Sequence, residues 1–430
     1  MSNKAQKRRL VPKLRFPEFM DSGEWESKPL AKVCNVLQGY GFPEALQGRS
    51  NGKYPFCKVS DISRAVAENG GLLAEATNYV GDDELLKLRA KLIPKGATVF
   101  AKIGEALRLN RRAYVQKECL IDNNATGLKA INGVAEDYFA YLLSQLIDLN
   151  EHYGGAVPSV NKSTLEEIEV VVPGPDEQKR IADCLASLDE RITLEAQKLD
   201  TLKTHKKGLM QQLFPAEGET LPKLRFPEFR DDGEWEVKTL EDIAKISSGG
   251  TPNRAEPDYW GGSIPWITTS LIDFNRIDNA EEFITTEGLK NSSAKLFPAQ
   301  TLLMAMYGQG KTRGKVALLG IEATANQACA AIMLDKEIDT NFVFQNLASR
   351  YNEIRKLSNE GGQENLSAGL IKEIPLIHPC LAEQQKIANC LASLDDLITA
   401  QTQKLTALKT HKKGLMQQLF PSVGGVAGEA

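Results

Sequence analysis

The chain has 430 residues, a formal net charge of −4 at pH 7, 42% hydrophobic residues and 25% charged residues. This composition is typical of a globular protein and excludes a disordered or fibrous chain. No apolar run approaches the roughly 20 residues of a membrane-spanning helix, and the basic N-terminus lacks the apolar core of a signal peptide. Seven scattered cysteines without a C-x-x-C pair favour reduced thiols in the cytoplasm over a disulfide framework or a zinc site.

The sequence contains two pairs of repeated segments. Residues 12–26, PKLRFPEFMDSGEWE, recur at 222–236 as PKLRFPEFRDDGEWE, and residues 177–215 recur at 383–421. The last fourteen residues of the longer pair, LKTHKKGLMQQLFP, are identical in both copies. The variable blocks, residues 27–157 and 237–360, share little sequence. This layout predicts a duplicated architecture with about one domain in each half.

In chain order, the first variable block has a turn and strand pattern at 95–102 and an amphipathic helix pattern at 137–149. The second block repeats this order, with a strand pattern at 298–306 and a helix pattern at 341–356. A long helix pattern follows each block. Short strands with adjoining helices predict the α+β class.

Each long repeated segment has the apolar period of a coiled-coil helix. Its apolar residues step by three and four over 181–213, and again over 387–419. A 3.5-residue spacing sustained over several heptads is typical of a helix that pairs with another helix. About 38 residues at 1.5 Å each correspond to a rod of roughly 55 Å.

Polar residues interrupt this apolar seam at matched positions. They are Glu195 and Lys206 in the first copy, and Gln401 and Lys412 in the second. Parallel pairing in register would place the two lysines in one apolar layer, so the pattern predicts an antiparallel pair. The alternative is two separate helices that each cover their own domain.

The expected fold is therefore α+β, with two globular domains in a tandem pseudo-twofold repeat, separated by two long antiparallel coiled-coil helices. The expected parts are a first domain at 1–173, a central helix at 174–215, a second domain at 216–378, a C-terminal helix at 379–421 and a disordered tail at 422–430.

One motif is particularly specific. The pattern Glu-Gln-x-x-Ile-Ala-x-x-Leu-x-x-Leu-Asp occupies 177–189 after Pro173 and Pro175, and it recurs from Glu383 to Asp395 after Pro379. The blocks also contain the runs GYGFP at 39–43, YPFCKVSDI at 54–62, GGTP at 249–252 and IPWITTS at 264–270. With these motifs nearly the whole chain resembles the specificity subunit of type I restriction–modification systems.

The resemblance implies a non-catalytic chain that reads a bipartite DNA site through two target-recognition domains. It implies two methyltransferase subunits and two motor–nuclease subunits as partners, and no membrane. The helices would set the spacer between half-sites and dock the methyltransferases. No cofactor or metal is expected on this chain, whereas S-adenosylmethionine, ATP and Mg²⁺ are expected on the partners. The absence of an Asn-Pro-Pro-Tyr or Asp-Pro-Pro-Tyr motif agrees with this division of labour.

Each variable block contains a basic segment, although the chain as a whole is acidic. Residues 95–118 hold six basic and two acidic side chains, and residues 298–320 hold three basic side chains and no acidic one. Such segments suit phosphate contacts. The more ordinary interpretation of a charged loop is a solvated surface.

We expect DNA contacts from these basic segments, from the opening loops, and from the amides that follow, because amides can bond adenine N6 and N7. In the first half the candidates are Tyr40, Phe42, Lys58, Ser60, Lys102, Arg108, Arg111, Arg112 and Asn123. In the second half they are Thr251, Trp266, Thr268, Thr269, Ser270, Tyr307, Gln309, Lys311, Thr312, Arg313, Asn326 and Gln327. The amides are equally plausible as turn residues.

Two alternatives to DNA recognition remain open. Residues 305–312, AMYGQGKT, match a relaxed phosphate loop, but the following apolar run 316–320 indicates a strand where such a loop needs a helix. The other alternative is a coiled-coil scaffold whose end domains bind protein or glycan, which the overall acidity suits.

Overall fold

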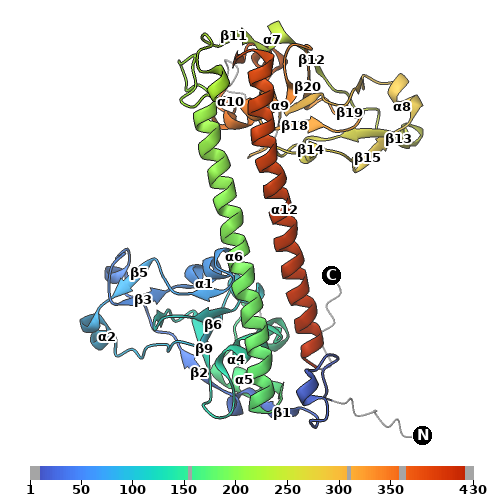
Figure 1. Ribbon diagram of the computed structural model, residues 1–430. Helices are drawn as coiled ribbons and strands as arrows, with labels where there is room; N and C mark the ends of the chain where they lie inside the picture. The colour runs from blue at the N-terminus through green and yellow to red at the C-terminus, as the bar shows by residue number, and fades with distance from the viewer. Residues whose placement is uncertain (1–9, 154–156, 308–310, 358–364, 422–430) are drawn as a thin grey trace, which may run out of the picture. The chain divides into compact units, whose positions relative to one another are not determined.

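The computed structural model describes residues 10–153, 157–307, 311–357 and 365–421 (Figure 1). The chain forms two compact units, Met1–Lys198 with Thr402–Ala430, and Leu199–Gln401. Each unit contains one mixed domain of strands and helices. Each also contains part of two 39-residue helices, α6 (Pro175–Leu213) and α12 (Leu381–Leu419). The predicted α+β class and long helices are confirmed. The finer five-part division stays a prediction, and the expected tail lies outside the described residues.

The domain of the first unit is built on three sheets. Its five-stranded sheet has the order β2-β9-β6-β7-β4, with β2 Cys34–Gln38, β9 Ala125–Ala130, β6 Thr98–Ala101, β7 Ala113–Val115 and β4 Leu72–Leu73. The smaller sheets are β5-β3-β8 (Asn78–Val80, Tyr54–Cys57, Leu120–Ile121) and β1-β10 (Glu26–Pro29, Glu169–Val172). The helices are α1 Val59–Glu68, α2 Asp82–Leu88, α3 Glu105–Arg108, α4 Asp137–Gln145 and α5 Lys162–Glu167.

The second unit repeats this plan. Its five-stranded sheet has the order β12-β20-β17-β18-β14, with β12 Ala244–Ser248, β20 Cys329–Leu334, β17 Leu302–Ala305, β18 Val316–Leu319 and β14 Arg276–Ile277. The other sheets are β15-β13-β19-β16 (Glu282–Ile284, Trp260–Ile267, Ala323–Ala325, Leu296–Phe297) and β11-β21 (Glu236–Thr239, Pro375–His378). The helices are α7 Leu240–Ile243, α8 Thr286–Lys290, α9 Thr340–Ser349, α10 Tyr351–Ile354 and α11 Ala368–Lys372.

The strands predicted at 95–102 and 298–306 are β6 and β17, whose side chains are all buried because both strands are central in their sheets. The helix predicted over 137–149 ends at Gln145. The single helix predicted over 341–356 was wrong in extent. It is broken between α9 and α10 at Arg350, whose guanidinium donates to the Pro375 carbonyl at 2.5 Å and to Glu353.

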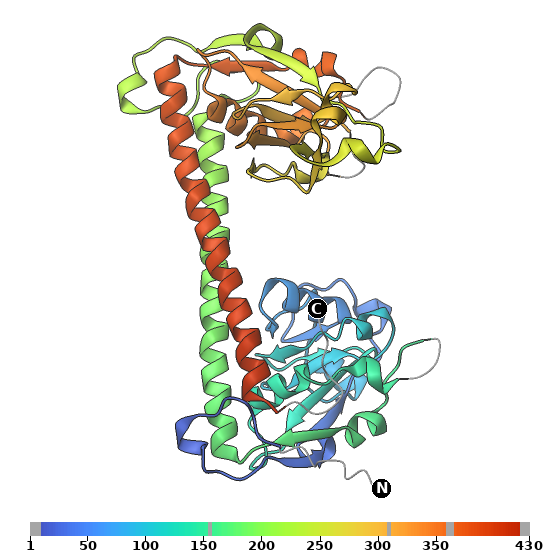
Figure 2. The same ribbon diagram turned by 90° about the vertical axis from the view of Figure 1, so that its right-hand side faces the viewer.

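The two long helices run antiparallel within each unit (Figures 1 and 2). In the first unit, Lys412 of α12 pairs with Asp189 of α6, and Lys404 pairs with Glu195, each at 2.6 Å. In α12, Lys404 precedes Lys412, whereas in α6 their partners come in the opposite order, with Glu195 after Asp189. This is the order expected of an antiparallel pair. The predicted antiparallel pairing is confirmed.

The short repeated segments close the core of each unit. In the first unit, Trp25 packs edge-on against Phe139 and Phe420, with ring centroids 6.1 and 5.9 Å apart. In the second, Trp235 packs against Phe342 at 5.9 Å. Buried aromatic side chains of this size contribute much of a core's stability. The repeated residues 12–26 and 222–236 are therefore structural.

Candidate nucleic-acid interface

Three loops and the start of helix α1 meet at one edge of the sheets in the first unit. We call this the first loop edge, made of residues 39–43, 58–60, 102–104 and 122–124. The strand register brings them together, because the end of β6 lies opposite the start of β9 and the end of β3 lies beside the end of β8. Backbone hydrogen bonds join the loops: Tyr40 N donates to Ile121 O at 2.9 Å, and Lys102 N donates to Asn124 O at 2.9 Å.

The second unit has an equivalent edge. This second loop edge consists of residues 249–252, 268–270, 306–307 and 326–328. Gly250 N donates to Ala325 O at 2.8 Å, Asn326 N donates to Ile267 O at 2.9 Å, and Met306 N donates to Ala328 O at 2.8 Å. The Thr251 hydroxyl also donates to the Gln327 side chain. Segments about 80 residues apart in the chain thus form one surface.

The first glycine of each opening loop is required by the geometry. A Cβ atom on Gly39 would lie 1.8 Å from the Asp122 carbonyl oxygen, and one on Gly249 would lie 2.1 Å from the Ala325 carbonyl oxygen. Both contacts are with backbone, which cannot move aside. The runs GYGFP and GGTP therefore begin with glycine because the opening loop crosses another chain segment at this point.

Aromatic side chains support both loop edges, each with a cation over them. In the first, Phe42 stacks on Phe56 with ring centroids 3.9 Å apart, and Lys58 Nζ lies 5.4 Å from the centre of Phe42. Cations over aromatic faces are held by the ring quadrupole. Phe42 and Lys58 thus hold each other in place at the edge.

In the second edge, the Arg254 guanidinium lies 3.7 Å from the centre of the Trp260 ring, 4.8 Å from that of Trp266, and pairs with Glu282. Arg254 is exposed and was missed by the sequence analysis, although it lies only two residues after the GGTP run. Trp266 is buried and donates its Nε1 hydrogen to Gly250 O at 3.0 Å. Trp266 is therefore an anchor of the opening loop, and its predicted DNA contact is not supported.

Most of the predicted contact residues reach the surface. The exposed ones are Ser60, Arg108, Asn123, Ser270, Tyr307, Lys311 and Gln327. The partly exposed ones are Tyr40, Phe42, Lys58, Lys102, Arg111, Thr251, Thr268, Thr269, Thr312 and Asn326. Gln309 lies outside the described residues. The surface residues belong to the loop edges or to the β6–β7 and β17–β18 connections, which leave the same ends of the sheets.

Two predicted arginines are buried. Arg112 lies over the Phe100 ring at 4.5 Å and donates to the Ile147 carbonyl at 3.1 Å, and burial lowers its pKa to about 10. Arg313 donates to the Arg355 carbonyl at 2.9 Å. Both side chains hold the connections in which they lie, so their position does not support a contact with phosphate.

A cavity of about 280 Å³ adjoins the first loop edge. It is lined by Gln38, Lys102, Thr126, Ser159, Val160, Asn161, Lys162 and Leu165. Asn161 caps α5 by accepting from Thr164 N at 2.9 Å, which places the exposed Lys162 at the start of that helix. The sequence analysis missed Asn161 and Lys162, since they follow the variable block.

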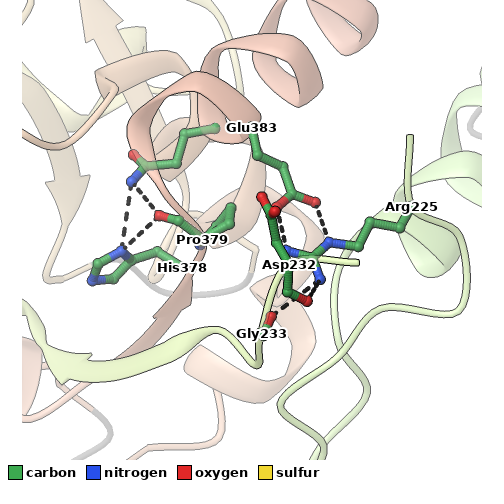
Figure 3. A network of polar contacts seen from close by, with 7 residues as sticks. Arg225, Asp232, Gly233, His378, Pro379 and Glu383 are labelled. Carbon is green, nitrogen blue, oxygen red and sulfur yellow. Dashed lines mark hydrogen bonds and ion pairs between the residues drawn. The ribbon is translucent and has the colours of Figure 1, made fainter. Parts of the chain in front are cut away.

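One group of possible metal ligands occurs among the described residues: Asp232, Cys380 and Glu383. Figure 3 shows why it is structural. Both Glu383 carboxylate oxygens accept from Arg225, at 2.8 and 2.7 Å, and Arg225 also donates to the Asp232 and Gly233 carbonyls. Because the Arg225 guanidinium bonds both oxygens of the buried Glu383 carboxylate, this carboxylate is already fully paired.

Two further features bear on function. Lys311 and Thr312 of the relaxed phosphate-loop match are followed by a turn and then by β18, so the predicted strand is confirmed and no helix begins at this pair. In the part of the chain that the structure describes, no helix has the length and apolar character needed to cross a membrane.

Comparisons with known proteins agree on one family. Residues 22–204 and 232–410 match the family described as type I restriction modification DNA specificity domain. The chain is 32% identical over 182 residues to the type I restriction enzyme EcoR124I/EcoR124II specificity subunit of Escherichia coli, covering 40% of this chain and 44% of that protein. This alignment thus spans under half of that relative.

Two other proteins are similar over nearly their whole length. The MjaVIII specificity subunit of Methanocaldococcus jannaschii is 22% identical over 422 residues, covering 95% of this chain and 93% of that protein. The crystal structure of the type I restriction–modification system S subunit from M. genitalium superposes with a TM-score of 0.63 at 17% identity, covering 96% of this chain and 100% of that one. The two chains share a fold.

Proposed function

The chain belongs to the family of type I restriction–modification DNA specificity proteins, and on this premise we propose that it reads a bipartite DNA site for partner enzymes. The observation that carries the proposal is the duplication. One chain holds two family domains, and each presents a loop edge with the same backbone framework and different side chains. Two such edges suit two unlike half-sites.

Direct reading of bases would come from the exposed and partly exposed side chains of the loop edges. Asn123, Asn326 and Gln327 offer amides that match adenine, and Ser270 offers a hydroxyl. Tyr307 is 40% exposed at the end of β17. Loops on a rigid sheet are suited to this task because their side chains can vary without changing the fold.

Phosphate contacts would come from the exposed and partly exposed cations around the edges. In the first unit these are Lys102, Arg108 and Arg111, and in the second they are Arg254 and Lys311. Local basic groups can bind DNA although the whole chain is acidic, since phosphates are contacted by individual side chains.

The partners would be methyltransferase and motor–nuclease subunits, two of each, which would carry S-adenosylmethionine, ATP and Mg²⁺. The identical helix ends at 202–215 and 408–421 support two copies of one partner. Their exposed residues are identical, as at Lys207 and Lys413, whereas several exposed positions earlier in α6 and α12 differ, as at Leu194 and Ala400. Because these exposed residues do not pack in a core, their identity in the two helices suggests that both helix ends present the same binding surface.

The proposal is tested with the chain in complex with its methyltransferase. Methylated sites are sequenced for the native chain and for a chain whose residues 27–157 come from another family member. We expect one half-site to change and the other to stay. A change in both half-sites, or sequence-independent binding with no methylated motif, would contradict the proposal.

A salt titration distinguishes DNA recognition from the alternative function, a scaffold that binds protein or glycan. Phosphate contacts make log affinity for DNA fall linearly with log salt, by about 0.9 per phosphate neutralised. A flat response, or no DNA binding by the complex, would favour the scaffold.

A further inference from the structure

The repeated Glu-Gln pair at the start of each long helix contains a buried amide that contacts the neighbouring domain. In the first unit, Gln178 is 1% exposed. Its Oε1 accepts from Glu136 N at 3.1 Å, and its Nε2 donates to the carbonyls of Val134 and Pro173 at 3.1 and 2.9 Å. The side chain of Gln178 thus joins the first turn of α6 to the first turn of α4.

The second unit repeats the arrangement with a different domain. Gln384 is 1% exposed. Its Oε1 accepts from Asp339 N at 2.8 Å, and its Nε2 donates to the Pro379 carbonyl at 2.9 Å and lies 3.5 Å from His378 Nδ1 (Figure 3). Glu136 and Asp339 are equivalent, because each is the residue that caps the helix following the last strand of the large sheet.

The contact with the domain that both glutamines share is made to a backbone N–H, that of Glu136 or Asp339. The segments that supply this N–H differ in sequence, INGVAED at 131–137 and DKEIDT at 335–340. Every residue except proline provides the same backbone N–H and carbonyl. One glutamine can therefore hold domains of different sequence, which side-chain contacts cannot do.

Other contacts between helix and domain are specific to each unit. Asp189 accepts from the Tyr138 hydroxyl at 2.5 Å, whereas its equivalent, Asp395, accepts from Gln345 Nε2 at 2.7 Å. Tyr138 and Gln345 come from different turns of α4 and α9, since Phe139 and Phe342 are the equivalent residues of these helices. These contacts change with the domain, and the glutamine contact does not.

We propose that Gln178 and Gln384 are positioning residues that fix each recognition domain on the long helices through the backbone N–H of the residue that caps α4 or α9. This rests on the proposed function. Since α4 and α9 pack on the large sheets whose other ends form the loop edges, the start of these helices sets the direction in which each edge points. Loss of the contact loosens one domain and spares the other.

The test uses the full chain in complex with its methyltransferase, with Gln178→Ala and Gln384→Ala. The matched control is Gln385→Ala, which removes an exposed neighbour of Gln384. Methylation rates are measured on the cognate site and on sites with one mismatched base pair in either half. We expect Gln178→Ala to lower discrimination about tenfold in the half-site of the first domain only, and Gln384→Ala in the other only.

A second variant separates donor from acceptor. Gln178→Glu keeps an acceptor for Glu136 N–H but turns a carboxylate oxygen toward the Val134 and Pro173 carbonyls. At pH 8 we expect Gln178→Glu to lose more discrimination between cognate and mismatched sites than Gln178→Ala does. At a lower pH that protonates the new carboxyl, we expect this discrimination to recover in part. Equal losses at both pH values would contradict the donor role.

Amide hydrogen exchange in the same complex distinguishes this inference from the proposed function. Gln178→Ala should speed exchange in peptides over 131–139 and leave 335–342 unchanged, whether or not the complex reads DNA. Unchanged exchange at 131–139, or equal loss of discrimination in both half-sites, would overturn the inference. Normal exchange effects without sequence-specific methylation would overturn the proposed function alone. Exchanging the block 27–157 should leave the effect of Gln178→Ala unchanged.

Discussion

Lys412 Nζ lies 2.6 Å from Asp189 Oδ2, and the equivalent residues of the other repeat, Lys206 and Asp395, are also 2.6 Å apart. Each lysine interrupts the apolar seam of one helix and meets a carboxylate of the other. The lysines are 16% and 17% exposed. A charge held this far from water needs its partner, so the pairs select the antiparallel arrangement.

Removing one carboxylate should destabilise its own unit. Asp189→Ala leaves the ammonium of Lys412 and the hydroxyl of Tyr138 without their shared acceptor, and we expect a cost of about 1–3 kcal/mol in the free energy of unfolding. Lys404→Ala is the control, because Lys404 is 45% exposed and such pairs contribute about 1 kcal/mol or less. Urea titration followed by circular dichroism measures both. Equal costs would contradict a structural role for the seam pair.

The buried pair of Arg15 and Glu177 should matter more. Their side chains are 6% and 4% exposed, and the hydrogen bond and charge of Glu177 raise the pKa of Arg15. Glu177→Gln leaves a buried guanidinium without its carboxylate, and we expect a loss of about 3–5 kcal/mol. Glu383→Gln should act alike in the second unit. Thermal unfolding of the two variants checks this, and a change below about 1 kcal/mol would show that the pair is dispensable.

In the first opening loop, substitution by alanine should be harmful at Gly39 and harmless at Gly41. Gly39→Ala forces a Cβ against the Asp122 carbonyl, so we expect loss of stability and weaker methylation of sites read by the first domain. Gly41→Ala is the control, because no atom lies within 4 Å of its Cβ position. Tolerance of both substitutions would mean that the loops do not cross as described.

Substitution by alanine should affect DNA binding at an exposed arginine and stability at a buried one. Arg108→Ala should weaken DNA binding and lower the slope of log affinity against log salt by about 1, as expected for one phosphate contact. Arg112→Ala should instead lower stability, because its guanidinium is buried and bonded to backbone. The pair is compared by DNA-binding titration at several salt concentrations and by thermal unfolding.

Thiol reactivity should follow burial. Burial raises the pKa of Cys34 and of Cys329 to about 12, so both remain neutral thiols near pH 8. Cys380 is exposed. Since the thiolate is the nucleophile, iodoacetamide should alkylate Cys380 well before Cys34 and Cys329, as peptide mass spectrometry would measure. Early alkylation of Cys329 would contradict the packing of β20.

Much of the architecture could be predicted from local patterns. The heptads from Ile181 to Leu213 and from Ile387 to Leu419 required long helices, and the lysines within the seam indicated their direction. Exact repetition of 202–215 at 408–421 indicated duplication. These features depend on residues close together in the chain, whose spacing alone decides which face of a helix is apolar.

The interface depended on contacts between distant residues. Nothing near Gly39 in the chain shows that it crosses Asp122, and nothing near Arg112 shows that Ile147 and Phe100 enclose it. The same holds for Gln178, whose buried amide meets a backbone 42 residues earlier. Strand register and packing create these contacts. Whether a polar side chain faces solvent or serves the fold therefore depends on which distant segments lie against it.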